Sequence, residues 1–296
     1  MTEPPGFDAD VWCSCNNELG EGPLAHPDRH SLIWFDILQR RIFERDFNGG
    51  EPRVHTLDVM PSAAGLIDDR RILVATEVDL RLFDLDTGAA QPLQPFLDRH
   101  DHLRSNDGRV HPSGAFWIGS MGKNAEPRAG AVWWFRAGDL RLLFDGITIP
   151  NSISFVPGGG AAYFADTPKG IIWRVAVDKD TGLPEGEPVE FVRFASGDGA
   201  PDGAVVDADG HLWVAAWGAS AVHVFRPDGQ RLSSYRLPVS QPTCPAFFGS
   251  RLDELAVTTA REKLIAEALA EEPQAGSVLK LRCAVPGVRE PNVRIA

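Results

Sequence analysis

The chain has 296 residues, of which 43% are apolar and 24% are charged, and its formal net charge at pH 7 is −12. Its 29 glycines and 23 prolines follow no Gly-X-Y period, which excludes collagen-like and low-complexity chains. The acidic balance argues against duplex nucleic acid or an anionic membrane as a main partner, because both attract clustered lysine and arginine. A chain of this length can bury a large core.

The N-terminal segment and the cysteines set expectations for the cellular compartment. Residues 1–10, MTEPPGFDAD, lack a basic region and an apolar region, so they are predicted not to be a signal peptide. No apolar run approaches the roughly 18 residues of a membrane-spanning helix. The cysteines at 13, 15, 244 and 283 match no zinc-site spacing. We therefore expect a reduced, cytoplasmic protein.

One pattern recurs along the chain: a turn, an apolar strand, a variable loop and a second apolar strand. Its copies begin at residues 26, 68, 111, 157, 207 and 250, at spacings of 42, 43, 46, 50 and 43 residues. A period of roughly 40 to 50 residues with short strands is typical of propeller blades. The sequence thus predicts an all-β fold, a six-bladed β-propeller, as a single domain over residues 1–296. Aromatic residues recur at one phase and are expected to pack between blades: Trp34, Phe116, Trp117, Tyr163, Phe164 and Trp213.

Two segments depart from this repeat. Residues 261–272 have apolar residues at helical spacing and stop before Pro273, which predicts a short helix inserted in the sixth repeat. Residues 11–15 precede the first repeat, and we expect them to join the sheet of the last blade. Such pairing would close the ring, hold the chain ends together and cover the sheet edges.

The chain lacks the common catalytic motifs, since it has no Gly-x-Ser-x-Gly, no His-Glu-x-x-His and no P-loop. Polar residues instead precede the repeat strands, in GEGP at 20–23, RSNDG at 104–108, PNS at 150–152 and APDG at 200–203. The segment that enters each blade lines one end of a propeller channel, so we expect these side chains to converge at one mouth. Their carboxylate and amide oxygens are ligands for hard divalent cations. Asp-Gly and Asn-Asp-Gly are also plain turn sequences, so simple turns remain an alternative to a metal site.

At these residues the sequence resembles the SMP-30/gluconolactonase/regucalcin family of sugar lactonases, over nearly the whole chain. The resemblance implies a six-bladed propeller with one divalent metal in the central channel, held by Glu21, Asn151 and Asp202. It also implies that Asp202 is the general acid/base and that Arg104 and Asn106 contact the substrate. The matching segments, in order, are LGEGP (19–23), IWFDI (33–37), NDGRV (106–110), GSM (119–121), PDG (201–203), GHLWVA (210–215) and TTAR (258–261).

The chain departs from the family pattern at positions that bear on the substrate rather than on the reaction. Some members have an acidic substrate contact where this chain has Lys123 and Asn124, with Glu126 close by, and we take Asn124 as the candidate contact. Many members have Phe, Asp and Gly where this chain has Ser105, His111 and Ser152.

The implied reaction is hydrolysis of a sugar lactone, an aldonolactone, to the aldonic acid. A bound cation can stabilise charge on the carbonyl oxygen, lower the pKa of a bound water, or do both, and Asp202 would move a proton between water and the leaving alkoxide. The expected partner is a small-molecule lactone, and the metal is Ca²⁺ by preference, with Zn²⁺, Mn²⁺, Mg²⁺ and Fe²⁺ left open. The alternatives are a non-catalytic calcium-binding regulatory propeller, esterase or organophosphate hydrolysis on the same metal site, and a protein-interaction propeller.

Overall fold

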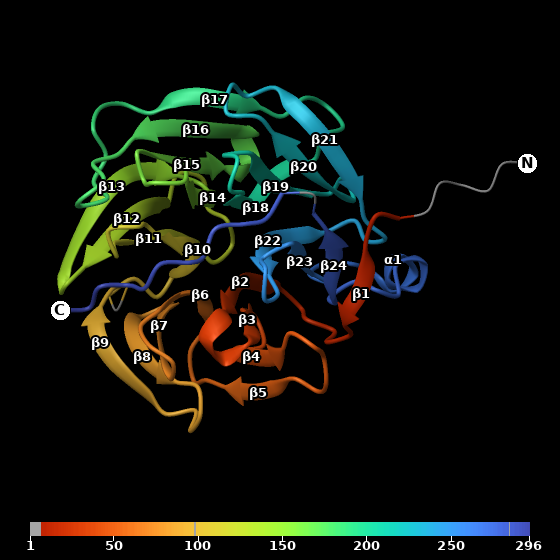
Figure 1. Ribbon diagram of the computed structural model, residues 1–296, viewed down its shortest axis with the longest axis horizontal. Coiled ribbons are helices and arrows are strands. Elements are labelled where there is room, and N and C mark those ends of the chain that lie inside the picture. The colour runs from red at the N-terminus through yellow and green to blue at the C-terminus, as the bar shows by residue number, and fades with distance from the viewer. Residues whose placement is uncertain (1–6, 98, 284) are drawn as a thin grey trace, which may run out of the picture.

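A computed structural model of the chain describes residues 7–97, 99–283 and 285–296. Residues 1–6, part of the segment predicted not to be a signal peptide, lie outside the described residues. The strands of the described residues form six antiparallel sheets of four strands each, arranged like blades around a central channel (Figure 1). The predicted single-domain, six-bladed β-propeller is therefore confirmed. No helix among these residues is long and apolar enough to cross a membrane.

The blades follow one another in chain order. In blades 1 to 5 the strand nearest the centre of the ring comes first in the chain, whereas blade 6 takes its outermost strand from the start of the chain (Figure 1). Blade 1 is β2 (Gly20–His26), β3 (Ser31–Asp36), β4 (Arg41–Asp46) and β5 (Arg53–Thr56). Blade 2 is β6 (Pro61–Leu66), β7 (Arg71–Thr76), β8 (Asp79–Asp84) and β9 (Ala90–Pro95). Blade 3 is β10 (Leu103–Val110), β11 (Phe116–Gly122), β12 (Gly130–Arg136) and β13 (Asp139–Ile147). Blade 4 is β14 (Pro150–Phe155), β15 (Ala161–Asp166), β16 (Ile171–Ala176) and β17 (Val189–Arg193). Blade 5 is β18 (Ala200–Val206), β19 (Leu212–Trp217), β20 (Ala221–Phe225) and β21 (Arg231–Arg236). Blade 6 is β22 (Pro242–Phe248), β23 (Glu254–Thr259), β24 (Val278–Arg282) and β1 (Asp10–Cys13).

Blade 6 is completed by a strand from the other end of the chain. β1 pairs antiparallel with β24, with Val11 opposite Leu279 and Cys13 opposite Val278. The expected pairing of residues 11–15 with the last blade thus holds as far as Cys13, where the strand ends. Because β1 covers the outer edge of β24, the ring closes by hydrogen bonds between the two ends of the chain.

Among the described residues, six large apolar clusters each lie between two neighbouring blades, and a smaller seventh consists of Leu19, Ile37 and Ala260. Trp34 is fully buried between blades 6 and 1, and Trp117 is fully buried between blades 3 and 4. Tyr163 and Trp213 occupy the corresponding places between blades 4 and 5 and between blades 5 and 6. The recurring aromatic residues therefore pack between blades, as predicted, and truncating one of these to alanine should cost about 3–5 kcal/mol.

Each innermost strand shifts register against its neighbour near the end where it begins. Bulges of this kind bend a strand and re-aim its side chains, and they are common beside active sites. Gly22 and Ser152 both have a φ of 55° there, a left-handed conformation that suits glycine and strains serine. The Ser152 hydroxyl donates to the carbonyl oxygen of Asp202 at 2.5 Å, which offsets part of that strain. The shifts lie between Glu21 and Leu24, Pro61 and Ala63, Ser105 and Gly108, Asn151 and Ser154, Pro201 and Ala204, and Pro242 and Pro245.

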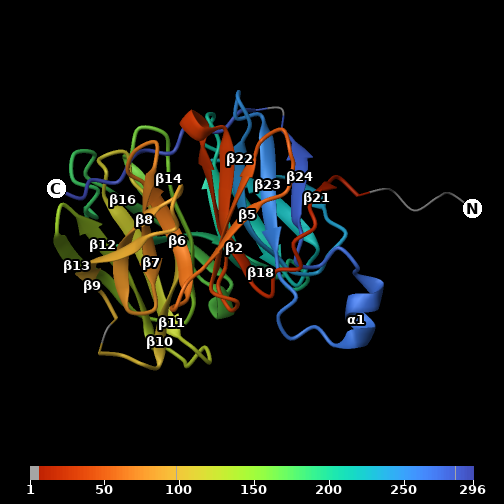
Figure 2. The same ribbon diagram turned by 90° about the horizontal axis from the view of Figure 1, so that it is seen from below.

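The two ends of the channel are covered differently. The helix α1 (Ala266–Glu271) lies at one end of the molecule and the C-terminal segment crosses the other (Figure 2). The predicted helix over 261–272 is shorter than expected, because Lys263 takes a left-handed φ of 60° and Ile265 is extended, so helical geometry begins only at Ala266.

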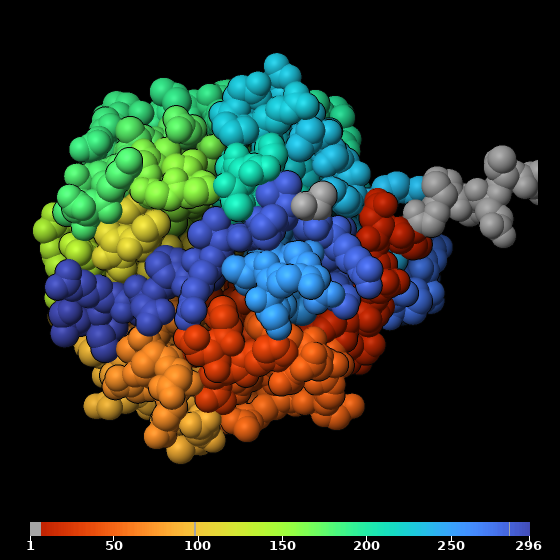
Figure 3. Space-filling model, viewed as in Figure 1, coloured from red at the N-terminus to blue at the C-terminus, as the bar shows by residue number. Residues whose placement is uncertain are grey.

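The C-terminal segment, residues 285–296, runs across the face shown in Figure 3 and is bonded to several blades. It accepts a hydrogen bond from the backbone of Ala208 in blade 5 and donates one from Val293 to Leu66 in blade 2. Glu290 of this segment forms an ion pair with Arg109 of β10, and both side chains are nearly buried. This end of the channel is therefore covered by the chain itself.

Candidate active site

A cavity of about 220 Å³ lies at the channel end where the innermost strands begin. The residues predicted as ligands, acid/base and substrate contacts come from blades 1, 3, 4 and 5, yet they share this cavity, as the phase of the repeats predicts. These residues are Glu21, Arg104, Asn106, Asn124, Asn151 and Asp202. The remaining wall is formed by Leu19, Met121, Lys123, Ala125, Ile149, Thr167, Trp217, Glu262 and Lys263.

A chain of side-chain hydrogen bonds connects three neighbouring blades across the cavity wall. The Asn106 amide donates to Oδ1 of Asn151 at 2.8 Å and to the carbonyl oxygen of Pro150 at 3.0 Å. Asn151 donates from Nδ2 to the hydroxyl of Thr167, in the 3-10 helix η2 (Thr167–Lys169), at 2.8 Å. That hydroxyl donates to the carbonyl oxygen of Pro201 at 2.8 Å. The Asn151 amide is thereby fixed in orientation, and Oδ1 keeps a second lone pair for a further ligand.

Arg104 is the buried cation of the cavity wall, with only 8% of its surface exposed. Its Nη1 donates to Oδ1 of Asn106 at 2.7 Å and to the carbonyl oxygen of Ser105 at 2.9 Å. Burial lowers the pKa of Arg104, while the neighbouring acids, Glu262 and then Glu21, favour its charged form. The guanidinium therefore supplies one positive charge within an acidic cavity.

Three buried carboxylates interact with one another: Glu21 and Asp202 line the cavity with Arg104, and Asp107 acts on both of them. Burial, and then repulsion from Asp107, raises the pKa of Glu21 to about 8. Burial raises the pKa of Asp107 to about 6, and burial together with the charges of Glu21 and Asp107 raises the pKa of Asp202 well above its usual range. Arg104 offsets only part of this repulsion. Acids perturbed in this way are typical of catalytic or cation-binding positions.

The donor set suits a hard divalent cation. Glu21 and Asp202 offer carboxylate oxygens and Asn151 offers an amide oxygen, which are ligands that such cations prefer. A cation among them would favour the charged forms of acids that Arg104 alone cannot balance. Within the described part of the chain, no group of three or more His, Cys, Asp or Glu side chains is placed to hold a metal. Binding of a cation would therefore depend on the Asn151 amide oxygen and on water or substrate in the remaining coordination positions.

Charged wall residues on two loops were not foreseen from the sequence. Lys123 forms an ion pair with Glu77 of blade 2 at 2.6 Å, so its ammonium is held at one side of the cavity. Glu262 and Lys263 reach the cavity from the segment between β23 and α1, and their side chains pair at 2.9 Å. The amphipathic pattern of this segment indicated a helix, and the pattern alone does not reveal that its first residues turn toward the channel.

The structure gives Asp107 a contact beyond its turn and places Asn124, whose role as a substrate contact stays a prediction, at the rim of the cavity. Asp107 accepts a hydrogen bond from the backbone N–H of Ile153 at 2.7 Å, so it ties the bulge beside Asn151 to β10 instead of only shaping a turn. Asn124 is exposed at the rim, and its amide donates to Oε1 of Glu126 at 3.0 Å. The Asp-Gly pair at 107–108, in the same motif as Asn106, is the one sequence signal that could have identified Asp107.

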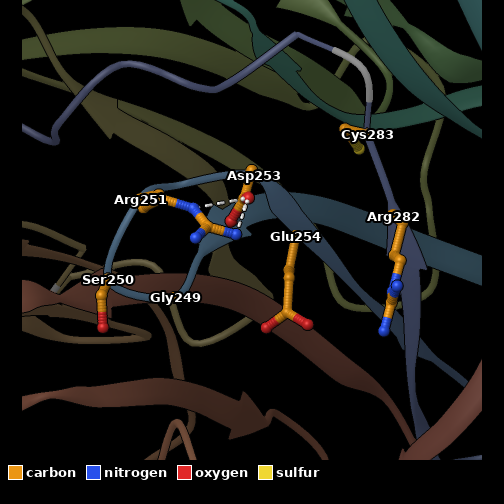
Figure 4. A pocket seen from close by; sticks show the side chains of 7 residues that line it. All are labelled: Gly249, Ser250, Arg251, Asp253, Glu254, Arg282 and Cys283. Atoms are coloured by element: carbon orange, nitrogen blue, oxygen red, sulfur yellow. Dashed lines mark hydrogen bonds and ion pairs between the residues drawn. The ribbon is translucent and has the colours of Figure 1, made fainter.

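A larger hollow, of about 420 Å³, lies on blade 6 (Figure 4), and it is lined by Gly249, Ser250, Arg251, Asp253, Glu254, Arg282 and Cys283. Figure 4 shows Arg251 turned toward Asp253, to which it donates at 2.7 Å. The Arg251 side chain is 83% exposed, and this hollow lacks the buried, converging donors of the channel cavity. The channel cavity is therefore the better candidate for chemistry.

Fold and cavity together define the class: a six-bladed propeller whose channel mouth brings buried acids, amides and one arginine to a small polar cavity. Residues 19–261 match the family model of the SMP-30/Gluconolactonase/LRE-like region. The chain belongs to this family, so the resemblance inferred from its motifs is confirmed. The prediction that the protein is a gluconolactonase-like enzyme is confirmed as well.

Relatives similar over the whole chain support this placement. A protein of Rhizobium meliloti (strain 1021), provisionally named a sugar lactone lactonase, is 41% identical over 100% of both chains. The 6-deoxy-6-sulfogluconolactonase of Pseudomonas putida is 34% identical over 92% of this chain and 94% of its own. The crystal structure of a calcium-binding protein, regucalcin, from Agrobacterium tumefaciens strain C58 is similar with a TM-score of 0.95, 41% identity and coverage of 97% and 98%.

Proposed function

We propose that this protein hydrolyses a sugar lactone to the corresponding aldonic acid, with a divalent cation held by Glu21, Asn151 and Asp202. The observation that supports the proposal is the convergence of these three oxygen donors with Arg104 and Asn106 in one cavity at the channel mouth. The named lactonases among its relatives support the choice of substrate class.

The bound cation would stabilise negative charge on the lactone carbonyl oxygen and acidify a bound water. The chain's own residues supply orientation and proton transfer. Asn151 is held by Asn106 and Thr167, so its oxygen is presented in a fixed direction. Asp202 takes a proton from the attacking water and returns it to the ring oxygen as the ester bond breaks. Arg104 has donors to offer the substrate, since both of its hydrogen bonds come from Nη1.

The test is a lactone panel with chelated protein and single added cations. D-Glucono-1,5-lactone and a pentonolactone are followed by acid release, at a pH low enough to suppress spontaneous opening, with Ca²⁺, Mg²⁺, Mn²⁺, Zn²⁺ or Fe²⁺. Chelation should abolish turnover and one of the cations should restore it. Asp202→Asn should lower kcat by at least about 100-fold. The control is Asp180→Asn, on an exposed hairpin, and it should keep full activity.

Two outcomes separate this proposal from its alternatives. Full activity in the Asp202→Asn protein would refute the acid/base role. Tight cation binding, measured by calorimetry, without turnover of any lactone would favour a calcium-binding regulatory propeller. That second function has one specific support, the description of its structural relative as a calcium-binding protein.

A further inference from the structure

Glu262 is a half-buried acid on a segment that is firmly attached to the propeller. It lines the cavity, and 25% of its side chain is exposed. Its carbonyl oxygen accepts a hydrogen bond from Nε2 of Gln241 at 3.2 Å, and the preceding N–H, of Arg261, donates to the carbonyl oxygen of Glu18 at 3.0 Å. The carboxylate is therefore carried on a backbone that two neighbouring segments hold in place.

The Arg104 guanidinium, which lines the same cavity, keeps donors free. Both of its hydrogen bonds within the described residues are made by Nη1, so Nε and Nη2 have no protein acceptor there. Glu262 is the acid that most strongly favours the charge of Arg104, yet the two side chains form no ion pair within 4.0 Å. A buried guanidinium with unused donors and an acid that lines the same cavity, with no ion pair between them, leave a place for a group that bonds to both.

A hydroxyl group fits that space chemically. A carboxylate only accepts hydrogen bonds and a guanidinium only donates them, whereas a hydroxyl does both. We propose that Glu262 is a specificity-determining residue, and that it and Arg104 together hold a substrate hydroxyl, Glu262 as acceptor and Arg104 as donor. This inference rests on the proposed function, and it adds that Glu262 selects for a hydroxyl of the sugar lactone, so that an unsubstituted lactone gains nothing from it.

The ion pair between Lys263 and Glu262 does not occupy the whole Glu262 carboxylate. The Lys263 ammonium contacts Oε1 of Glu262 at 2.9 Å, while the Lys263 side chain is 86% exposed, so the pair is screened by water and leaves Oε2 free. Lys123, the other lysine of the cavity, is already held by Glu77. Among the described wall residues, Glu262 is thus the acid outside the proposed metal ligands that can accept from a substrate hydroxyl.

The experiment compares Glu262→Ala and the isosteric Glu262→Gln with wild type and with Glu267→Gln, an exposed glutamate on α1. Kinetics are measured on D-glucono-1,5-lactone and on δ-valerolactone, which lacks hydroxyls. Direct binding is measured by calorimetry with 1,5-anhydro-D-glucitol, a ring polyol that has no carbonyl and cannot be hydrolysed. We expect kcat/KM for the hydroxylated lactone to fall roughly tenfold or more in both Glu262 variants, chiefly through KM. δ-Valerolactone turnover should change less than twofold, and Glu267→Gln should match wild type throughout.

The polyol titration separates this inference from the proposed function. Weaker polyol binding in the Glu262 variants, with unchanged Tm and cation affinity, supports hydroxyl recognition even if wild type opens no lactone. Equal losses on both lactones, unchanged kinetics on both, or no polyol binding by wild type would each overturn the inference. If Glu262→Ala fails to fold, Glu262→Gln decides, since it keeps the shape of the side chain but removes its charge and replaces one acceptor oxygen with an NH2 donor.

Discussion

Replacing Glu21 with glutamine is expected to stabilise the cation-free protein and to abolish its stabilisation by divalent cations. The Glu21 carboxyl is buried beside Asp107, and its pKa is raised to about 8 from a usual value near 4.5. A carboxyl with a raised pKa binds more protons in the folded state than in the unfolded state, so its ionisation opposes folding as the pH rises from about 4.5 to about 8. Glutamine has the same shape, still accepts from the Gly22 N–H, and has no charge to bury.

The magnitude follows from the two pKa values. At pH 7 the unfolded carboxyl is ionised and the folded one is mostly protonated, which costs the folded state about 3 kcal/mol. At pH 5 the same cost is only about 1 kcal/mol. Glu21→Gln should therefore raise Tm by roughly 5–10 °C at pH 7 and by much less at pH 5. Added cation should raise the Tm of wild type more at pH 7 than at pH 5, because the ligands must be deprotonated.

The assay is thermal unfolding after chelation, at both pH values, with and without added Ca²⁺ or Mn²⁺. Glu267→Gln, which is exposed on α1, serves as the matched control and should shift neither transition. The reasoning is refuted if chelated Glu21→Gln is less stable than wild type at pH 7, or if its advantage does not grow between pH 5 and pH 7. It is equally refuted if the variant keeps the full stabilisation by cation.

Three further changes test other parts of the structure. Thr167→Val removes the hydroxyl that orients Asn151 and should weaken cation binding about 10- to 100-fold in calorimetry, with little change in Tm. Glu290→Gln leaves Arg109 buried without its partner and should cost about 3 kcal/mol or more in urea unfolding, a loss that an added Arg109→Met should partly reverse. Deleting residues 1–14 removes β1 and exposes the edge of β24, which should lower Tm and promote concentration-dependent association, visible by light scattering.

The fold could be predicted from the sequence because the repeats are regular and their aromatic residues share a phase. The positions of Glu21, Asn151 and Asp202 could be predicted for the same reason, since each lies near the start of an innermost strand. Roles that depend on contacts between distant segments could not be predicted. Glu262 comes from a helix-like insert and Glu290 from a non-repeating tail, and neither position has a periodic signal that points toward the channel.

The start of the helix α1 also could not be predicted from the sequence. The apolar spacing of residues 261–272 is helical, but Lys263 adopts a left-handed backbone, and the segment turns into the cavity before α1 begins. The role of Asp107, in the RSNDG motif at 104–108, could not be predicted either. Its Asp-Gly pair favours a turn, and only the neighbouring blade, which brings the Ile153 N–H to its carboxylate, makes it a brace for the Asn151 bulge.

A bulge recurs in all six innermost strands. It separates the residues that pack between the blades from the side chains that line the cavity. In some blades the bulge presents a long polar side chain to the cavity, as at Glu21 and Asp202. In others it carries a short hydroxyl that bonds to the next strand, as Ser62 bonds to Asn106 and Thr243 to Gly20. The apolar packing between the blades thus fixes the backbone, and the bulge of each innermost strand provides one position where the side chain differs between blades. We expect an exchange of one or two bulge residues to change the groups that the cavity offers to a ligand, while the apolar packing between the blades stays as it is.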